Sequence, residues 1–335
     1  MSISAKELAK MLNLSEAAVS LALNNKPGVS TQTRQKVWSL AQQMGYDFSK
    51  AHSRDARFKG TFCLVSYQKT GTILTDSFYF TALANGVLAG AKRNGYNLES
   101  LTILEDDDLD KHIYLLKKAE YAGVILLACE MDAASLQPFY NFKAPIILLD
   151  SCLERHPFNC VTVDNRQGTA LAVNHLLTKT RKHPGYLHSS YVTSTFAARS
   201  EGFFGAIKKL GLSTSSCVVH LLSPSQSGAY ADMKELIKAG EELAQCYFAD
   251  NDEIALGAMQ AFEEAGYRIP EDISIVGFSD VPAAETSHPP LTTIHVPAQY
   301  MGELAAARLV QIIEEKLDRP TRIEVSTELK KRKSV

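Results

Sequence analysis

The sequence of 335 residues lacks any run of about 18 consecutive apolar residues, the length that a membrane-spanning helix needs. Its N-terminus is polar and helical in pattern, which excludes the apolar core of a secretory signal peptide. Six cysteines are present, but none has CxxC or Cys/His ligand spacing. We therefore expect no membrane contact, no metal and no cofactor, and we expect the cysteines to be thiols in a reducing cytoplasm.

Motifs of catalysis are lacking as well. The sequence has no GxSxG elbow, no GxxxxGK[ST] loop and no GxGxxG after a strand, and His183 and His188 lack HExxH spacing. The acidic run Glu105–Asp108 has no EF-hand spacing and is interpreted as a solvated loop. No nucleophile and base are assembled by any recognisable pattern, so an enzyme is not expected.

The charge is unevenly distributed along the chain. The net charge of −2 combines residues 1–60, which hold nine Lys/Arg and four Asp/Glu, with a remainder that carries −7. A basic module on an acidic body is typical of a DNA-binding segment joined to a domain that does not bind DNA. Chance fluctuation is the alternative, because an excess of five charges is modest.

The stretch Ser4–Asn24 has the pattern of two short helices joined by a tight turn. Ser4 and Glu7 have the spacing of a capping box at the start of the first helix. Asn13 tolerates the left-handed conformation that a sharp turn needs, and Ser15 caps the second helix. This pattern predicts either the helix-turn-helix unit that reads DNA or a helical hairpin that only packs.

A third helix completes a small core. Ser30 caps it and Gly45 ends it. Its single apolar stripe is formed by Val37, Leu40, Ala41 and Met44. Three helices within some 45 residues can enclose a minimal core, which favours the DNA-binding interpretation.

The rest of the chain alternates short apolar strands with longer helical segments. Strands are expected at 62–67, 98–104, 123–127, 145–149, 161–163, 185–187, 217–221, 244–248 and 273–277. Helices are expected at 80–94, 110–120, 168–177, 200–210, 233–239 and 252–265. Such alternation predicts an α/β fold with two doubly wound parallel sheets and a ligand cleft at the strand carboxyl ends.

Specific motifs carry a resemblance to a known family. The run LAKMLNLSEAAVSLALNNKPGVSTQTRQKVWSLAQQMGY resembles the headpiece of LacI/GalR-type bacterial transcription regulators. The segments VTVDNRQGTALAVNHLL, FAARSEGFFGAI and CYFADNDEIALGAMQAFEEAGYRIPEDISIVGFSD resemble the effector-binding core of the same family, which is similar to periplasmic sugar-binding proteins. The resemblance covers nearly the whole chain.

The resemblance implies that the second helix enters the major groove of operator DNA. The residues that it places at base edges are Ser15, Glu16, Ala17, Ser20 and Leu21. The residues that it places at phosphates are Asn24, Ser30, Thr33, Arg34 and Tyr46. Ser4 is also expected to take part in DNA binding. The alternative for each is a solvated helix residue. Because Ala17 and Leu21 stand where many relatives have basic or amide residues, we expect base reading through small and apolar contacts.

The same resemblance implies a small-molecule effector site between the lobes. Its residues would be Tyr79, Phe80, Asp150, Arg199, Tyr230, Asn251, Ser279 and Asp280. Asp150 ends a strand, and Arg199, expected just before a helix, matches the family's ligand-clamping arginine. Ser279 replaces an acid that often accepts a hydrogen bond from a sugar hydroxyl, so a charge-assisted bond is lost. Core packing is the alternative for Phe80.

The hinge departs from the family pattern. Residues 48–60 are polar and basic, and Asp55 stands where the family usually has a leucine that wedges open a minor-groove step. A register slip would offer Phe58 instead. We expect a hinge without a wedge and therefore weak bending of the operator.

We interpret the chain as a DNA-binding transcriptional repressor controlled by a small molecule, with a carbohydrate as the expected effector. The expected domains are a headpiece at 1–47, a hinge at 48–60 and an effector-binding and dimerisation core at 61–335. Within the core, the first lobe would comprise 61–160 and 291–322, and the second 161–289 and 323–335, with crossovers near 160–163, 287–292 and 322–326. A homodimer and not a tetramer is expected, because related tetramers carry a leucine-heptad helix at the C-terminus and none follows the run 322–329 here. A sugar-binding transport receptor and an α/β enzyme are the alternatives.

Overall fold

The computed structural model divides into two compact units, Met1–Lys59 and Gly60–Val335, which we describe separately. It describes residues 3–23, 28–44, 46, 58–69, 78–153, 156–317 and 319–335, without the side chain of Thr31. Asn24, Gly45, Asp47 and residues 48–57 of the expected hinge, including Asp55, lie outside these ranges, so the wedge-free hinge stays a prediction. No helix within the described residues is both long and apolar enough to span a membrane.

The first unit, which we call the headpiece, contains three helices. They are α1 (Ala5–Leu12), α2 (Glu16–Leu23) and α3 (Thr31–Gln43). The capping box is confirmed, since Ser4 accepts from the backbone N–H of Glu7 while the Glu7 carboxylate accepts from that of Ser4. Asn13 adopts the left-handed conformation, with φ of 51°. The expected helix starts after Ser15 and Ser30 are also confirmed, because both hydroxyls accept a backbone N–H of the first turn.

The headpiece core is small and fully apolar. Its buried side chains are Leu8, Ala9, Val19, Ala22, Leu23, Val37 and Ala41. Trp38 fastens α3 to α2, because its indole N–H donates to the carbonyl of Ala22 at 3.0 Å. Met44 was expected on the apolar stripe but is 42% exposed. The helix ends at Gln43, and the non-helical backbone of Met44 turns that side chain off the stripe.

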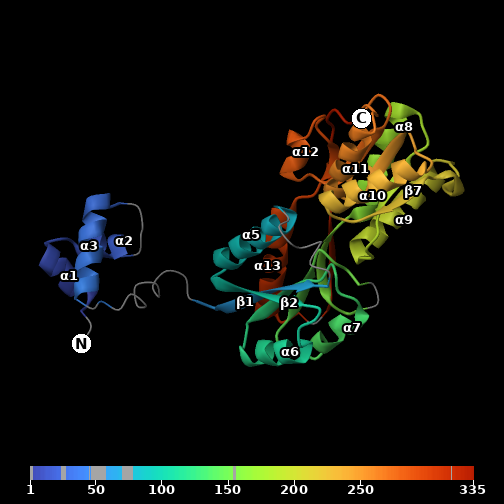
Figure 1. Cartoon of the computed structure of the whole chain (residues 1–335). Coiled ribbons are helices and arrows are strands. Elements are labelled where there is room, and N and C mark those ends of the chain that lie inside the picture. Colours follow the sequence, from blue (N-terminus) through green and yellow to red (C-terminus); the bar gives the residue numbers. More distant parts are fainter. Residues whose placement is uncertain are drawn as a thin grey trace. The chain divides into compact units, whose positions relative to one another are not determined.

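The second unit contains two six-stranded sheets (Figure 1). The first has the order β11-β5-β4-β3-β1-β2 and consists of β1 (Gly60–Gln68), β2 (Tyr96–Leu104), β3 (Gly123–Leu127), β4 (Ile146–Leu149), β5 (Asn159–Val163) and β11 (Arg322–Val325). The second has the order β12-β10-β9-β8-β6-β7 and consists of β6 (Gly185–Ser189), β7 (Val219–Leu222), β8 (Cys246–Ala249), β9 (Ser274–Ser279), β10 (Thr292–His295) and β12 (Glu328–Lys330). All paired strands are parallel except β12, which is antiparallel to β10. The two doubly wound sheets expected from the sequence are therefore confirmed.

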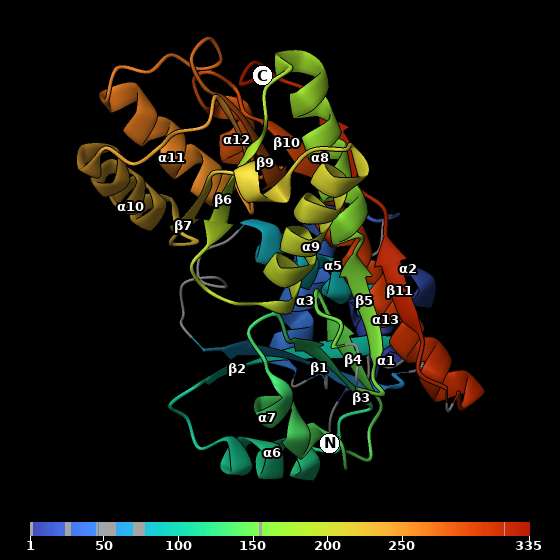
Figure 2. The same cartoon turned by 90° about the vertical axis from the view of Figure 1, so that its right-hand side faces the viewer.

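Helices cover both faces of each sheet, which defines two lobes (Figures 1 and 2). The helices of the first lobe are α5 (Phe78–Arg93), α6 (Leu109–Lys118), α7 (Ala133–Leu136), η1 (Gln137–Phe139) and α13 (Ala298–Glu315). Those of the second are α8 (Asn165–Thr180), α9 (Ser194–Lys209), η2 (Thr214–Ser216), α10 (Gln226–Ala239), α11 (Asp252–Glu264) and α12 (Pro282–Thr286). One core cluster joins α5 and α13 to α8 and α9, while separate clusters lie under α6 and under α10 and α11.

Glycines allow α5 and α13 to pack at backbone contact. A Cβ atom added to Gly86 would lie 2.0 Å from the carbonyl oxygen of Gln299, and one added to Gly302 would lie 2.1 Å from that of Leu83. Any side chain at either position would force the helices apart. The two helices therefore form one rigid block on the first sheet.

Several sequence-based boundaries are wrong. The helix expected at 233–239 begins at Gln226, because the hydroxyl of Ser225 caps it by accepting the N–H of Gly228 at 3.2 Å. The helix expected to start at Ser200 begins at Ser194, because the hydroxyl of Thr193 caps it by accepting the N–H of Phe196 at 3.1 Å. The segment expected to start the first lobe again at 291 begins instead with β10, which hydrogen-bonds to β9 in the second sheet. The chain thus crosses between lobes after Val163, His295 and Val325, and β5 and β11 belong wholly to the first sheet (Figure 2).

Candidate functional site

The outer face of α2 carries the side chains expected at base edges. Ser15, Glu16, Ala17 and Ser20 are exposed, on the side opposite the buried Val19. Leu21 is half-buried, and a Cβ on Gly28 would lie 3.1 Å from its Cδ1 atom, so this leucine packs beside the loop that precedes α3. The helix therefore offers a short face of small and polar groups.

The residues expected at phosphates are more scattered. Ser4 is exposed, but its hydroxyl is 2.7 Å from the Glu7 carboxylate that completes the cap. Ser30 is exposed and its hydroxyl lies 2.8 Å from that of Thr33, which is half-buried, as is Arg34. Tyr46 is half-buried against the headpiece core.

In the second unit, Asp150 is the central group of the candidate cleft. It follows β4 directly, is buried, and has φ of 59°, a left-handed conformation that turns the chain sharply. The hydroxyl of Tyr79, at the start of α5, donates to its Oδ1 atom at 2.7 Å. Burial raises the pKa of Asp150 to about 6, against the opposing effects of the Tyr79 hydrogen bond and the Arg199 charge. Burial also raises the pKa of Tyr79 well above its usual value, so Tyr79 remains a donor.

Phe80 supports Tyr79 more than it opens to the cleft. Its ring meets the Tyr79 ring edge-on, with centroids 5.1 Å apart, and it packs partly buried against the main core cluster. The core-packing alternative thus describes its contacts in the structure.

Arg199 lies inside α9 and not before it, which corrects the expectation from sequence. Its Nε atom donates to Oδ1 of Asn165 at 2.9 Å, and Nη1 donates to the backbone carbonyl of Asp250. The guanidinium lies 3.9 Å from the centroid of the Phe278 ring. Within the part of the chain that the structure describes, Nη2 makes no hydrogen bond, so this nitrogen is available to a ligand.

A cavity of about 400 Å³ lies between the lobes. Its lining includes Tyr79 from the first lobe and Ser279 and Asp280 from the end of β9 in the second. The structure therefore brings Tyr79, Asp150, Ser279 and Asp280 to one region. Arg199 belongs to the same region through its charge interaction with Asp150.

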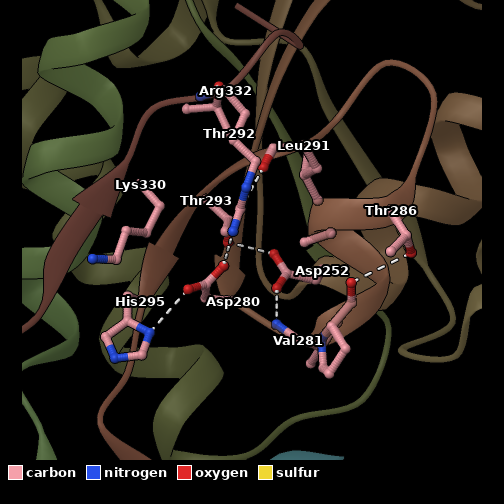
Figure 3. A network of polar contacts seen from close by, with 12 residues as sticks. Asp252, Asp280, Val281, Thr286, Leu291, Thr292, Thr293, His295, Lys330 and Arg332 are labelled. Carbon is pink, nitrogen blue, oxygen red and sulfur yellow. Dashed lines mark hydrogen bonds and ion pairs between the residues drawn. The ribbon is translucent and has the colours of Figure 1, made fainter.

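Asp280 is committed to protein contacts (Figure 3). Its Oδ1 accepts from Arg332 at 2.6 Å, and its Oδ2 is 2.9 Å from Nδ1 of His295. Ser279 and Asp280 both have positive φ, at 123° and 62°, so the chain bends back at the strand end. The contacts of Asp280 hold this bend, and the neighbouring Ser279 is half-buried and lines the cavity.

Two residues that were expected to bind the ligand, Tyr230 and Asn251, make their hydrogen bonds elsewhere in the second lobe. The hydroxyl of Tyr230, in the middle of α10, donates to Glu264 at 2.7 Å and accepts from Lys234 at 2.8 Å, in an exposed cluster between α10 and α11. Asn251 uses its side-chain oxygen to cap α11 and its amide nitrogen to donate to the carbonyl of Pro224 at 3.1 Å.

Two buried acids were missed by sequence reasoning. Asp250 is fully buried and accepts from the Tyr186 hydroxyl, from His188 and from the backbone N–H of Ser189. Asp252 is also fully buried and accepts from Thr293 and from the backbone N–H of Val281 (Figure 3). Burial raises the pKa of Asp252 to about 7. The signal was present, because both acids belong to the motif ADND directly after a strand.

Comparisons with known proteins agree with this arrangement. The sequence pattern of a family described as a periplasmic binding protein-like domain matches residues 173–335. The chain is 30% identical to the HTH-type transcriptional repressor PurR of Mannheimia succiniciproducens and 29% identical to that of Pasteurella multocida, over 98% of each chain.

Solved structures share the fold of the chain. The complex of the transcriptional regulator CelR with cellobiose has a TM-score of 0.75 at 22% identity and covers 99% of this chain and 100% of that one. The Lac repressor dimer bound to operator and the anti-inducer ONPF has a TM-score of 0.71 at 20% identity and covers 100% of this chain and 99% of that one. A LacI family regulator from Enterococcus faecium with bound ribose has a TM-score of 0.69 at 25% identity and covers 82% of this chain and 98% of that one.

A helix-turn-helix headpiece joined to a two-lobed core with a cavity between its lobes defines a ligand-controlled regulator of transcription. The chain belongs to the LacI/GalR family of DNA-binding transcriptional regulators, and its relatives are repressors and not enzymes.

Proposed function

We propose that this protein is a cytoplasmic homodimer that represses transcription from operator DNA, and that a carbohydrate or sugar derivative bound between the lobes controls its operator affinity. In this proposal residues 1–47 read DNA, 48–60 form the hinge, and the core binds the effector and a second subunit. Family membership supports the regulatory role. Two of the solved relatives support a sugar, because cellobiose is bound in one and ribose in the other.

The observation that carries the effector proposal is the meeting of Tyr79, Asp150 and Arg199 between the lobes. A buried carboxylate accepts hydrogen bonds from hydroxyl groups, and the Nη2 atom of Arg199 carries two N–H donors in the plane of the guanidinium. Aromatic rings beside them offer an apolar surface to the C–H face of a sugar ring. Vicinal hydroxyls on an apolar ring face are the features of a carbohydrate, so this set suits one.

The cleft also suggests how the effector would act. Tyr79 and Asp150 belong to the first lobe and Arg199 and Ser279 to the second, while three crossovers join the two. A ligand that contacts both sides favours the lobe arrangement in which all contacts are made. Operator affinity then changes by linkage if the paired headpieces fit DNA in only one arrangement.

A thermal-shift screen of the full chain tests the effector class. Cellobiose, ribose and glucose are the sugar probes, and adenine and guanine are the nucleobase probes. A sugar that binds the folded state raises Tm by mass action. The matched control is Asp150→Asn, which keeps the shape of the side chain and should lose most of the shift. A shift with a nucleobase and none with any sugar would contradict the carbohydrate proposal.

DNA binding is tested on a duplex selected from a random library. Arg34→Ala should weaken binding to all duplexes and reduce the slope of log K against log salt by about 1, as loss of one phosphate contact predicts. Gln35→Ala is the matched control, because this neighbour is exposed but outside the predicted set. Equal behaviour of the two variants would remove Arg34 from the interface.

The homodimer is supported by the Lac repressor relative, which is described as a dimer on its operator. Sedimentation velocity at micromolar protein should give one species of twice the chain mass. A stable monomer, or a tetramer that persists on dilution, would contradict this state.

A further inference from the structure

Two cysteines of the first lobe lie in direct contact. Cys160 is in β5, and Cys152 is in the segment that follows β4. Their sulfur atoms are 2.8 Å apart, with the Cys160 thiol donating to the Cys152 sulfur. All six cysteines fall within the described residues, and no other two have sulfur atoms in contact there.

The two thiols differ in access. Cys160 is buried, whereas Cys152 is half-buried and lines a cavity of about 270 Å³ beside the first turn of α9. A small oxidant can therefore reach the sulfur of Cys152, while the sulfur of Cys160 is buried next to it.

The hydrogen bond between the two sulfurs favours the same division of roles, because the Cys160 thiol donates and the Cys152 sulfur accepts. Arg322 lines the same cavity as Cys152, and the register of β11 and β5 pairs it with Cys160. The thiolate is the reactive form of a cysteine. The pKa of Cys160 is raised by its hydrogen bond to Cys152 and by burial, so Cys160 holds its proton.

We propose that Cys152 and Cys160 are a redox-sensitive pair that forms a reversible disulfide when a hydroperoxide oxidises Cys152. The Cys152 thiolate attacks the peroxide, a sulfur–oxygen bond forms, the oxygen–oxygen bond breaks, and hydroxide leaves. The Cys160 sulfur then attacks the sulfenic acid, the disulfide forms, and water leaves. Two thiols lose two electrons and two protons, and hydrogen peroxide becomes two waters. A dithiol reductant reverses the change by thiol–disulfide exchange.

The location gives this bond a structural consequence. The segment that carries Cys152 also carries Asp150, which accepts from Tyr79, and Ser151, whose hydroxyl is 3.1 Å from that of Ser194 in α9. A disulfide would tie this segment to β5, the strand from which the chain first crosses to the second lobe. Its bearing on effector binding rests on the proposed function, but formation of the bond does not.

The experiment uses the full chain treated with hydrogen peroxide under conditions that leave methionine unmodified. The wild type should fall from six titratable thiols to four, with a mass decrease of about 2 Da, and its digest should contain a peptide joined through positions 152 and 160. Dithiothreitol should restore all six. A bond between any other cysteines, or six thiols after exposure, would overturn the proposal.

Variants assign the roles of the two sulfurs. Cys160→Ser should stop at the sulfenic acid, with a mass increase of about 16 Da, and Cys152→Ser should react far more slowly. Cys217→Ser is the matched control, because Cys217 is also half-buried but is 4.0 Å from a histidine and not from a thiol. This control should form the bond like the wild type, and its failure would count against the assignment.

Hydrogen exchange measures the structural consequence without a ligand. Backbone amides of 150–153 and 156–158 should exchange at least about tenfold more slowly in the oxidised wild type than in the reduced protein, because the cross-link restricts local opening. Those of α6, in the same lobe, serve as the internal reference. Unchanged exchange in both of these ranges would overturn the claim that the bond restrains this segment.

Discussion

The two lobes share a strand order, but the aspartates at their strand ends differ in how many hydrogen bonds they receive from the protein. In the second lobe, Asp250, Asp252 and Asp280 each receive two or more hydrogen bonds or ion pairs from the protein. In the first lobe, Asp150 receives one side-chain hydrogen bond from the described residues, that of Tyr79.

This difference indicates a division of labour. A buried acid whose acceptor sites are filled by its own lobe fixes the loops around it, because each donor would be costly to leave unpaired. A buried acid with acceptor sites left over can take up donors from a ligand. We therefore expect the second lobe to form a preorganised half of the cleft. We expect Asp150 of the first lobe to be the acid that accepts hydrogen bonds from the ligand.

The largest effect should come from Asp250→Ala. The change leaves the Tyr186 hydroxyl, His188 and the Ser189 amide without their acceptor in a fully buried place. We expect a loss of about 3 kcal/mol or more in the free energy of unfolding, measured in urea. Asp150→Ala is the control and should cost no more than about 1 kcal/mol. Equal losses for both would break the comparison between the lobes.

Arg199→Ala should have the next largest effect, on ligand affinity. Loss of a buried, charge-assisted contact costs roughly 2–5 kcal/mol, which would abolish a measurable sugar-induced shift in Tm. Duplex binding in the absence of sugar should persist. Arg199→Lys keeps a charge but loses the planar fork, and it should recover only part of the response. Wild-type sugar affinity in the alanine variant would exclude Arg199 from the site.

The pKa of Asp150 leads to a smaller, graded effect of pH. Sugar affinity should fall up to about tenfold per unit as pH drops below about 6, because the protonated carboxyl accepts fewer hydrogen bonds. Stability has the opposite sign. A carboxyl with a raised folded pKa stabilises the fold below its unfolded pKa, and that contribution is lost as pH rises through about 6. Isothermal titration calorimetry with the sugar from pH 5 to 8 measures the change in affinity, and Asp150→Asn should flatten that pH profile.

The smallest effect should come from Tyr230→Phe. Its hydroxyl joins an exposed cluster with Lys234 and Glu264, so its removal should change stability by no more than about 0.5 kcal/mol. Sugar affinity should stay at the wild-type value. A clear loss of affinity would return Tyr230 to the ligand site, where its position in the family pattern places it.

Local patterns were readable from the sequence, and contacts between distant strands were not. The caps at Ser4 and Ser30 were predicted because each depends on residues three positions apart. The partners of Asp250 come from β6, some sixty positions earlier, and only the strand register brings them close. Arg199 was placed before its helix because the first turn, Ser194–Ala197, has no apolar periodicity and is fixed by a cap at Thr193.

The three crossovers also govern the order in which the chain can fold as a ribosome makes it. The headpiece core closes within the first 46 residues and can form early. The first lobe begins next, but it lacks α13 and β11 until residue 325 has been added. Its apolar face on α5 therefore remains uncovered while the strands of the second lobe are made, up to β10. The nascent chain would be most exposed to chaperones and to aggregation in that interval, and release of the last segments completes both lobes almost together.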